Sequence, residues 1–143
     1  MKELKNWDNK TWLSSSTYVS SFNYFLLKKK KLNKNSRILD IGCGRGKIFG
    51  SLSRKLKLIN KPIGIDPVLH KDFDRSIDFK NEDVFKFFKN NKGKFDLIMI
   101  KQTLHFFNKE KRLKLIKTCK NNLKVNGVLL IFSLNTLNNE IPC

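Results

Sequence analysis

Several residue types and patterns are scarce or missing in this chain of 143 residues. Alanine is absent and arginine is rare, whereas lysine, asparagine, isoleucine and phenylalanine abound, which is typical of AT-rich coding. The sequence has no run of about 18 uncharged apolar residues, so we expect no membrane-spanning helix. Residues 1–8 include no apolar leader segment, which makes a cytoplasmic protein the default expectation.

Cysteine is scarce as well, and its placement excludes two kinds of site. Cys43, Cys119 and Cys143 lie far apart and form no Cys-x-x-Cys pair. An odd number of separated cysteines argues against a disulfide framework. Only His70 and His105 could complete a zinc ligand set, so we predict no metal. We interpret Cys43 as a small residue in a turn and Cys119 as a core residue of a helix.

Acidic residues are outnumbered, with 12 against 30 lysines and arginines, which gives a net charge of +18. One interpretation is a nucleic-acid partner, because a basic surface attracts polyanions. The other is biased coding, and we favour it, since arginine, the better residue for planar phosphate groups, is not enriched. Nucleic acid is therefore kept as an alternative partner.

The length predicts one domain with a sizeable core. Apolar residues recur at spacings of three and four between positions 18 and 26, as on one face of a helix. We interpret residues 1–32 as an N-terminal aromatic helix, residues 33–134 as an α/β domain and residues 135–143 as a tail.

The aromatic residues of the N-terminal segment have three interpretations. Trp12, Tyr18, Phe22 and Phe25 could form an apolar lid over a ligand cleft, or they could cover the edge of a sheet, and we hold these two equal. A membrane-surface helix is a weaker third interpretation, because its lysines cluster at one end instead of along one face.

Strand-like and helix-like patterns alternate through the α/β domain. We expect strands at 37–41, 62–65, 77–79, 95–100 and 127–134, and helices at 46–58, 84–88 and 109–123, the last with its inward face formed by Leu113, Leu115, Ile116, Cys119 and Leu123. Such alternation predicts a Rossmann-like, doubly wound α/β fold. Its sheet should be mostly parallel, with five strands in the order 3-2-1-4-5.

The most informative segment is 38–46, which reads ILDIGCGRG. A strand-like run is followed by three glycines at alternate positions, directly before a helical pattern. Glycine is needed where the backbone approaches a ligand or takes a positive φ. Because ligands of open α/β sheets bind outside the carboxyl ends of the strands, we interpret Gly42, Gly44 and Gly46 as a ligand-cradling turn.

Acidic residues after the expected strands indicate the kind of ligand. Asp66 ends the second strand, where a carboxylate can accept hydrogen bonds from ribose hydroxyls, and Asp83 follows the third. Asp40 stands beside the glycine turn, where it would repel a pyrophosphate but attract a cation. The spacing G-x-G-x-G also differs from the dinucleotide fingerprint G-x-G-x-x-G. These features favour a nucleoside with a cationic end, such as S-adenosylmethionine.

At these residues the sequence resembles the class I S-adenosylmethionine-dependent methyltransferases, in their broad small methyltransferase-domain group. The resemblance covers about residues 33–134. Its five pieces, in order, are a first motif at 38–46, a second at 64–66, a third at 81–84, a fourth strand with its loop at 95–105 and a fifth strand at 126–131. The resemblance implies an enzyme that uses S-adenosylmethionine as its cofactor.

The resemblance also implies roles for individual residues. Gly42 and Gly44 would approach the methionine end of the cofactor, and Asp66 would hold the ribose hydroxyls. Asp83 would accept a hydrogen bond from the adenine amine, and Val84 would present its backbone to the ring. The complete set that we expect at the cofactor is Asp40, Gly42, Cys43, Gly44, Gly46, Asp66, Asp83, Val84, Lys101 and Gln102. Two further acids have structural interpretations: Asp40 could instead tie down the turn, and Asp96 begins the fourth strand.

Two residues are candidates for catalysis. His105 could serve as a general base, because its ordinary pKa suits neutral pH, and Gln102 would border the methyl-transfer site. The alternative for His105, which we slightly favour, is a histidine packed between Leu104 and the pair Phe106–Phe107. Methyl transfer from a sulfonium often needs no strong base, so positioning and desolvation can supply most of the acceleration.

The resemblance ends near residue 134. The family usually adds two strands that form an antiparallel hairpin, and residues 135–143 contain no such pattern. The fifth strand would then present an exposed apolar edge. Three explanations stay open: a truncated chain, a minimal variant whose edge is covered by a partner or a second copy, and a module that binds the cofactor without turnover.

We therefore predict an S-adenosylmethionine-dependent methyltransferase that acts on a small molecule. One alternative is an RNA methyltransferase, which the charge motivates. The acid-Pro-Pro-aromatic motif of many base-modifying relatives is absent, however, and Lys101–Leu104 stands in its place. The other alternative is a non-catalytic cofactor-binding module that needs a partner.

Overall fold

The computed structural model describes residues 16–101 and 103–133. Five parallel strands form one sheet in the order β3-β2-β1-β4-β5, which confirms the predicted Rossmann-like fold and strand order. The strands are β1 (Ile38–Ile41), β2 (Ile63–Ile65), β3 (Asp78–Lys80), β4 (Phe95–Lys101) and β5 (Leu123–Phe132). The helices are α2 (Ser16–Lys29), α3 (Lys47–Leu56), α4 (Val84–Asn90), the 3₁₀ helix η2 (Leu104–Phe106) and α5 (Lys109–Asn121).

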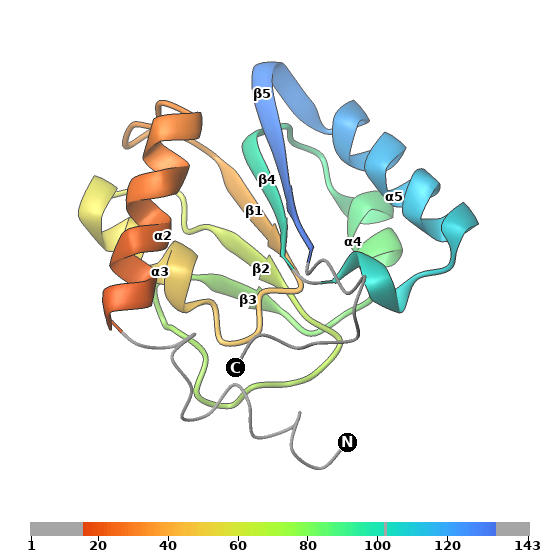
Figure 1. Cartoon of the computed structure of the whole chain (residues 1–143), viewed down its shortest axis with the longest axis horizontal. Coiled ribbons are helices and arrows are strands. Elements are labelled where there is room, and N and C mark those ends of the chain that lie inside the picture. Colours follow the sequence, from red (N-terminus) through yellow and green to blue (C-terminus); the bar gives the residue numbers. More distant parts are fainter. Residues whose placement is uncertain (1–15, 102, 134–143) are drawn as a thin grey trace, which may run out of the picture.

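Helices cover both faces of the sheet, with α2 and α3 on one side and α4 and α5 on the other (Figure 1). Alternate residues of β1 separate the two cores. Leu39 and Ile41 pack with the residues of α4 and α5, whereas Ile38 packs with those of α2 and α3. Burial on both faces explains why the central strands read as continuous apolar runs in the sequence.

Local signals set the start of two helices. The Asp83 side chain accepts the backbone N–H groups of Phe85 and Lys86 and so caps α4. The Asn108 side chain accepts the Lys111 N–H and caps α5. Such caps satisfy N–H groups that have no partner within the helix.

Strand register brings the carboxyl ends of the strands together at one edge of the sheet. Ile41 of β1 pairs with Ile65 of β2 and with Ile100 of β4, and Ile65 pairs with Lys80 of β3. The segments that follow these strands therefore start side by side, and they carry most of the residues predicted to bind a ligand.

The aromatic helix α2 packs on the sheet beside α3. The rings of Phe22 and Phe25 lie 4.9 and 5.6 Å from that of Phe132 in β5, and the buried Asn23 donates to Ser51 of α3. These contacts support the interpretation that the aromatic residues cover the sheet near its edge. Trp12 lies outside the described residues, and the lid role remains a prediction.

The C-terminal helix and strand differ from the expectation in their boundaries. The helix ends at Asn121, and Leu123, expected on its inward face, begins β5. The expectation for Leu113 was wrong too, since this side chain is 60% exposed while Leu115 and Cys119 are fully buried. The early part of β5 is irregular, with a register shift opposite β4 and a positive φ at Asn126, so it shows no regular strand alternation.

Among residues 16–101 and 103–133, no helix is both long and apolar enough to cross a membrane. Within the same residues, no cluster of three His, Cys, Asp or Glu side chains could hold a metal ion. The predicted tail, 135–143, lies outside the described residues.

Candidate functional site

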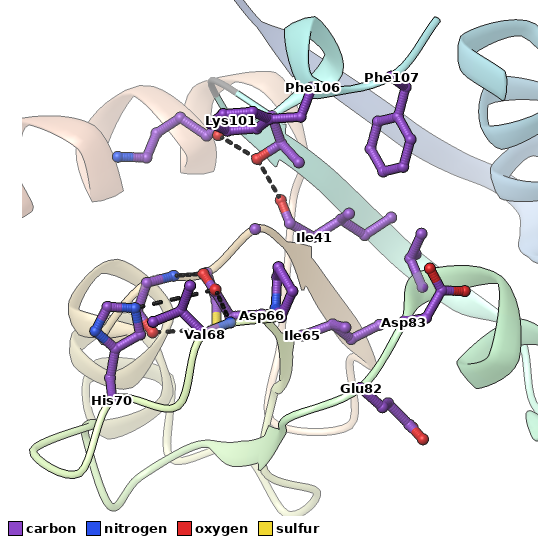
Figure 2. Close-up of a pocket in the computed structure, with 16 residues that line it drawn as sticks. Ile41, Ile65, Asp66, Val68, His70, Glu82, Asp83, Lys101, Phe106 and Phe107 are labelled. Atoms are coloured by element: carbon purple, nitrogen blue, oxygen red, sulfur yellow. Dashed lines mark hydrogen bonds and ion pairs between the residues drawn. The ribbon is translucent and has the colours of Figure 1, made fainter. Parts of the chain in front are cut away.

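A cavity of about 570 Å³ opens at the carboxyl edge of the sheet. Its walls come from the glycine turn after β1, the segment after β2, the start of α4 and the segment after β4 (Figure 2). Its size lies within the range of about 300–1,000 Å³ that is usual for small-molecule sites. The lining includes seven of the predicted cofactor residues, namely Gly42, Cys43, Gly44, Asp66, Asp83, Val84 and Lys101.

The glycine turn has the backbone that its sequence predicts. Gly42, Gly44 and Gly46 have φ angles of +75°, +56° and +70°. A Cβ atom at Gly42 would overlap the side chain of Thr103, so the turn requires glycine there for space as well as conformation. The N–H groups of Gly42 and Cys43 donate to the Ile65 carbonyl at 2.8 and 3.0 Å, which ties the turn to β2.

Gly46 and Cys43 differ in their relation to the cavity. Gly46 is not among its lining residues; it is the N-cap residue just before α3, and a Cβ there would overlap Ile77. Its glycine requirement is therefore explained by the packing of the turn. Cys43 lines the cavity and packs against Gly64, which agrees with its interpretation as a small residue in the turn.

Asp66 joins the glycine turn to the segment after β2. Its Oδ2 accepts the Gly44 N–H at 2.8 Å, and its Oδ1 accepts the Val68 N–H at 2.8 Å (Figure 2). The His70 Nε2 lies 4.0 Å from Oδ1. Each carboxylate oxygen can accept more than one hydrogen bond, so Asp66 can hold the turn and still accept donors from a ligand.

Asp40 is buried beside the turn, with 3% of its surface exposed. Its Oδ1 has no hydrogen-bond partner within the described part of the chain, whereas Asp66 accepts the Gly44 N–H of the turn. Burial raises the pKa of Asp40 to about 7; the Lys101 ammonium opposes this shift and the Asp66 carboxylate adds to it. Asp40 is not among the residues that line the cavity, although the adjacent Ile41 is. A buried carboxyl group with a spare acceptor at such a position is suited to receive a cationic ligand group.

Asp83 and Val84 form the wall opposite the turn. Both helix-capping bonds of Asp83 are accepted by its Oδ1. Val84 is buried and lines the cavity as the first residue of α4. The position combines an acceptor with an apolar contact, as a heteroaromatic ring with an exocyclic amine requires.

Lys101 ends β4 and also lines the cavity. Its Nζ lies 5.5 Å from the centre of the Tyr18 ring and 5.9 Å from that of Phe22, so helix α2 reaches the rim of the site. Strand register explains why Lys101 lies near Asp40. Asp40 pairs with Met99, and Lys101, two residues after Met99 in β4, lies on the same face of the sheet as both. Gln102 lies outside the described residues.

His105 stands apart from the cavity. It is exposed in η2, its ring lies 4.0 Å from that of Phe106, and it is not among the lining residues. The structure therefore does not bring it together with the cofactor residues, and its catalytic role remains a prediction.

Other lining residues were missed by the sequence reasoning. Thr103 donates to the Lys101 carbonyl at 2.9 Å and packs under Gly42, while Phe106 and Phe107 form an aromatic wall (Figure 2). Val68 and His70 line the cavity after β2. Their signal was position alone, because each follows the carboxyl end of a strand.

Comparison with known proteins agrees with this arrangement. A family described as a methyltransferase domain matches residues 16–139. Carboxy-S-adenosyl-L-methionine synthase from Helicobacter pylori strain G27 is 31% identical over 118 residues, which are 76% of this chain and 48% of that protein. The synthase of Helicobacter pylori strain Shi470 is 30% identical over 118 residues, which are again 76% of this chain and 48% of that protein. The chain thus spans about half the length of these curated relatives.

Solved structures share the fold. A SAM-dependent methyltransferase from Archaeoglobus fulgidus superimposes with a TM-score of 0.69 at 21% identity, covering 94% of this chain and 58% of that one. The plantazolicin methyltransferase BpumL, solved with a desmethylPZN analogue and SAH, gives 0.67 at 23% identity, covering 94% and 52%. With the family match over most of its length, the chain belongs to the methyltransferase-domain family.

Proposed function

We propose that this chain binds S-adenosylmethionine in the carboxyl-edge cavity and forms the cofactor-binding part of a methyltransferase that acts on a small molecule. The observation that carries the proposal is the convergence of the glycine turn, Asp66 and Asp83 on one cavity of about 570 Å³. Relatives whose names include S-adenosylmethionine, and neighbours solved with SAH, support the same ligand.

The residues present fit this cofactor at both ends. Asp40, with its buried unpartnered oxygen, would face the α-ammonium at the methionine end. Asp66 would accept the ribose hydroxyls with the lone pairs that its two backbone bonds leave. Asp83 and Val84 would contact the adenine.

The bound cofactor would supply a methyl group already activated on a sulfonium. The contribution of the chain is then to orient the two reactants and to exclude water. Phe106 and Phe107 supply an apolar wall for this purpose, and Lys101 and Thr103 border the space next to the turn. Gln102 and His105 stay catalytic candidates on the acceptor side.

The acceptor and a partner are inferred from other observations. A small molecule is favoured by relatives such as the plantazolicin methyltransferase and by Lys101–Leu104, where many base-modifying relatives carry an acid-Pro-Pro-aromatic motif. RNA stays the alternative that the charge of +18 motivates.

We also infer a partner or second copy at β5, an outer strand of the sheet on which Val125 is 92% exposed. A cytoplasmic location stays a prediction.

A second candidate function is modification of the cofactor itself. It is favoured by the 31% identity to carboxy-S-adenosyl-L-methionine synthase and by Lys101, a cation on the cavity wall that could hold a carboxylate. Mass spectrometry of the cofactor after incubation distinguishes the two functions. A methyltransferase yields S-adenosylhomocysteine in the presence of an acceptor, whereas a synthase of this kind yields a carboxylated cofactor only when a carboxyl donor is supplied, the new carboxyl group replacing a proton of the cofactor.

Isothermal titration calorimetry tests the binding step directly. We expect saturable binding of S-adenosylmethionine and S-adenosylhomocysteine, and no binding of NAD, because Asp40 would repel its pyrophosphate. Absence of heat with both adenosyl ligands, in a sample shown to be folded by circular dichroism, would overturn the proposed function.

A further inference from the structure

The connection between β2 and β3 lacks the element that usually joins parallel strands. Residues 66–77, all of which the structure describes, contain turns and bends but no helix. Parallel strands are normally joined through a helix, which satisfies its own backbone and packs on the sheet. A connection without one must be held in place by other contacts.

The main contact that holds this connection is an ion pair whose acidic partner, Asp74, is buried. The Asp74 side chain is 7% exposed, and its Oδ1 and Oδ2 lie 2.8 and 2.9 Å from the Arg54 Nη1 of α3. The same Oδ1 accepts the Ser76 N–H, and the Asp74 N–H donates to the Arg45 carbonyl at 2.8 Å. Any side chain at Gly50 would overlap the Asp74 carboxylate, so α3 is shaped to receive it.

The electrostatics of this ion pair are favourable. Burial raises the pKa of Asp74, but the Ser76 N–H and the Arg54 guanidinium outweigh burial and, with Lys47, leave the pKa below its ordinary value. Asp74 is therefore ionised at neutral pH. Arg54 also donates to the Ser76 hydroxyl at 2.8 Å, so one guanidinium holds two residues of the connection.

A second ion pair attaches the same segment to the glycine turn. The Arg45 Nε lies 3.1 Å from the Asp72 Oδ2, and the Arg45 side chain is only 10% exposed. Within the described residues this Nε has no hydrogen-bond partner, so the pair attracts through charge and without hydrogen-bond geometry. The connection is thus fastened on one side to α3 and on the other to the turn that lines the cavity. Its other half, with Asp66, Val68 and His70, forms a wall of that cavity.

From these contacts we propose that the Arg54–Asp74 ion pair is a positioning device for the ligand site. It replaces the missing helix and holds the connection so that Asp66 and Val68 keep their places on the cavity wall. The inference rests on the proposed function, since the ligand used to test it is the adenosyl cofactor. Neither Arg54 nor Asp74 touches the cavity, so their effect on binding is indirect.

The test is a double-mutant cycle on Arg54 and Asp74, in which the measured quantity is the affinity for S-adenosylhomocysteine. We expect Arg54→Gln and Asp74→Asn each to weaken binding by about tenfold, within the usual range for coupled sites. The double variant should bind no more weakly than the single variants, because all three lose the same contact. Arg54→Lys should recover part of the affinity, since all the Arg54 contacts come from one nitrogen, Nη1, whose charge and donor role a lysine ammonium can supply.

Two controls separate positioning from general stability. Asp96→Asn removes a carboxylate with the same kinds of partner, a backbone N–H and a cation, at the opposite edge of the sheet. Lys55→Gln changes the charge of an exposed neighbour on α3. Both should bind S-adenosylhomocysteine as the wild type does. Because Arg54 is itself largely exposed, the single variant Arg54→Gln still tests the inference if Asp74→Asn fails to fold and the cycle cannot be completed.

Limited trypsin digestion gives an independent readout. Lys71 and Arg75 are exposed cleavage sites within the connection. In the wild type the ligand should slow cleavage there, and Arg54→Gln should cleave faster without ligand. The inference would be overturned if Arg54→Gln and Asp74→Asn bound S-adenosylhomocysteine with wild-type affinity while losing as much stability as Asp96→Asn. Failure of the wild type to bind at all would instead overturn the proposed function.

Discussion

Aspartate residues at the carboxyl and amino ends of the strands differ in their hydrogen bonding and in the direction of their pKa shifts. Asp40, near the carboxyl end of β1, is buried, one of its oxygens has no partner among the described residues, and burial raises its pKa to about 7. Asp96, at the amino end of β4, accepts the Arg37 N–H at 2.7 Å and the Lys124 Nζ at 2.9 Å. Burial raises the pKa of Asp96, but these bonds outweigh it and leave the pKa below its ordinary value.

The glycines repeat this contrast. At the carboxyl edge, Gly42 has a positive φ and lies directly against Thr103. At the amino edge, the atoms nearest to a Cβ at Gly93 would belong to the end of the flexible Arg37 side chain. The carboxyl edge thus combines the buried Asp40 oxygen with three positive-φ glycines, whereas Asp96 at the amino edge accepts two hydrogen bonds; positive φ angles also occur elsewhere, at Lys57 and Asn126. Natural proteins tolerate such local conflicts mainly at functional sites.

The largest expected effect is on stability as a function of pH. The folded state favours protonated Asp40, so its contribution to stability is full below pH 4 and is lost as pH rises towards 7. The loss amounts to at most about 4 kcal/mol. Asp40→Asn should remove this decline, and urea unfolding of both proteins at pH 4.5 and 7.5 without ligand measures it.

The pH dependence expected from Asp96 has the opposite sign, since its contribution to stability is lost only as pH falls through its lowered pKa. Equal pH profiles for wild type and Asp40→Asn would remove the contrast between the edges.

The next largest effect concerns the glycine turn. Gly42→Ala forces a Cβ into the space of Thr103 at a positive φ, so we expect S-adenosylhomocysteine affinity to fall by about 100-fold. Gly93→Ala is the matched control at the amino edge and should bind normally, because the Arg37 side chain can move. Calorimetry decides, and similar affinities for the two variants would show that the turn tolerates a side chain.

A smaller effect is expected from Asp66. Asp66→Asn replaces an acceptor that fixes Gly44 and Val68, and affinity should fall by about tenfold, as for the loss of one charged hydrogen bond. Asp96→Asn should instead cost about 1–3 kcal/mol of unfolding free energy without changing affinity. Thermal melts and ligand titrations on both variants test the pair. An affinity loss in Asp96→Asn would mean that the two edges are not separable.

The smallest effect is expected from His105. Its side chain is exposed and outside the cavity lining, so His105→Gln should leave cofactor affinity unchanged and stability within about 0.5 kcal/mol. Fluorescence titration with S-adenosylhomocysteine measures the first and thermal unfolding the second. If an acceptor is found, a loss of turnover at unchanged cofactor affinity would support the catalytic prediction for this residue.

Much of the fold could be predicted because its signals are local. The apolar runs at β1 and β4 and the glycine turn after β1 fixed the parallel sheet and its ligand edge. The end of α5 could not be predicted, because Leu123 suits a helix face and a strand equally well. Its assignment to β5 depends on pairing with Phe95 across the sheet.

The sequence by itself determined the alternation of strands and helices, the positive-φ turn and the carboxylates that follow the strands. Only the tertiary structure decided which residues meet: Thr103 under Gly42, Lys101 beside Asp40, and Arg54 on Asp74. The reason is physical. Periodicity and turn chemistry act over a few neighbouring residues, whereas the Arg54–Asp74 contact joins residues 20 apart, and the weak Thr103 contact with the Ile41 carbonyl joins residues 62 apart. Such contacts exist only once strand register has set the distances between segments.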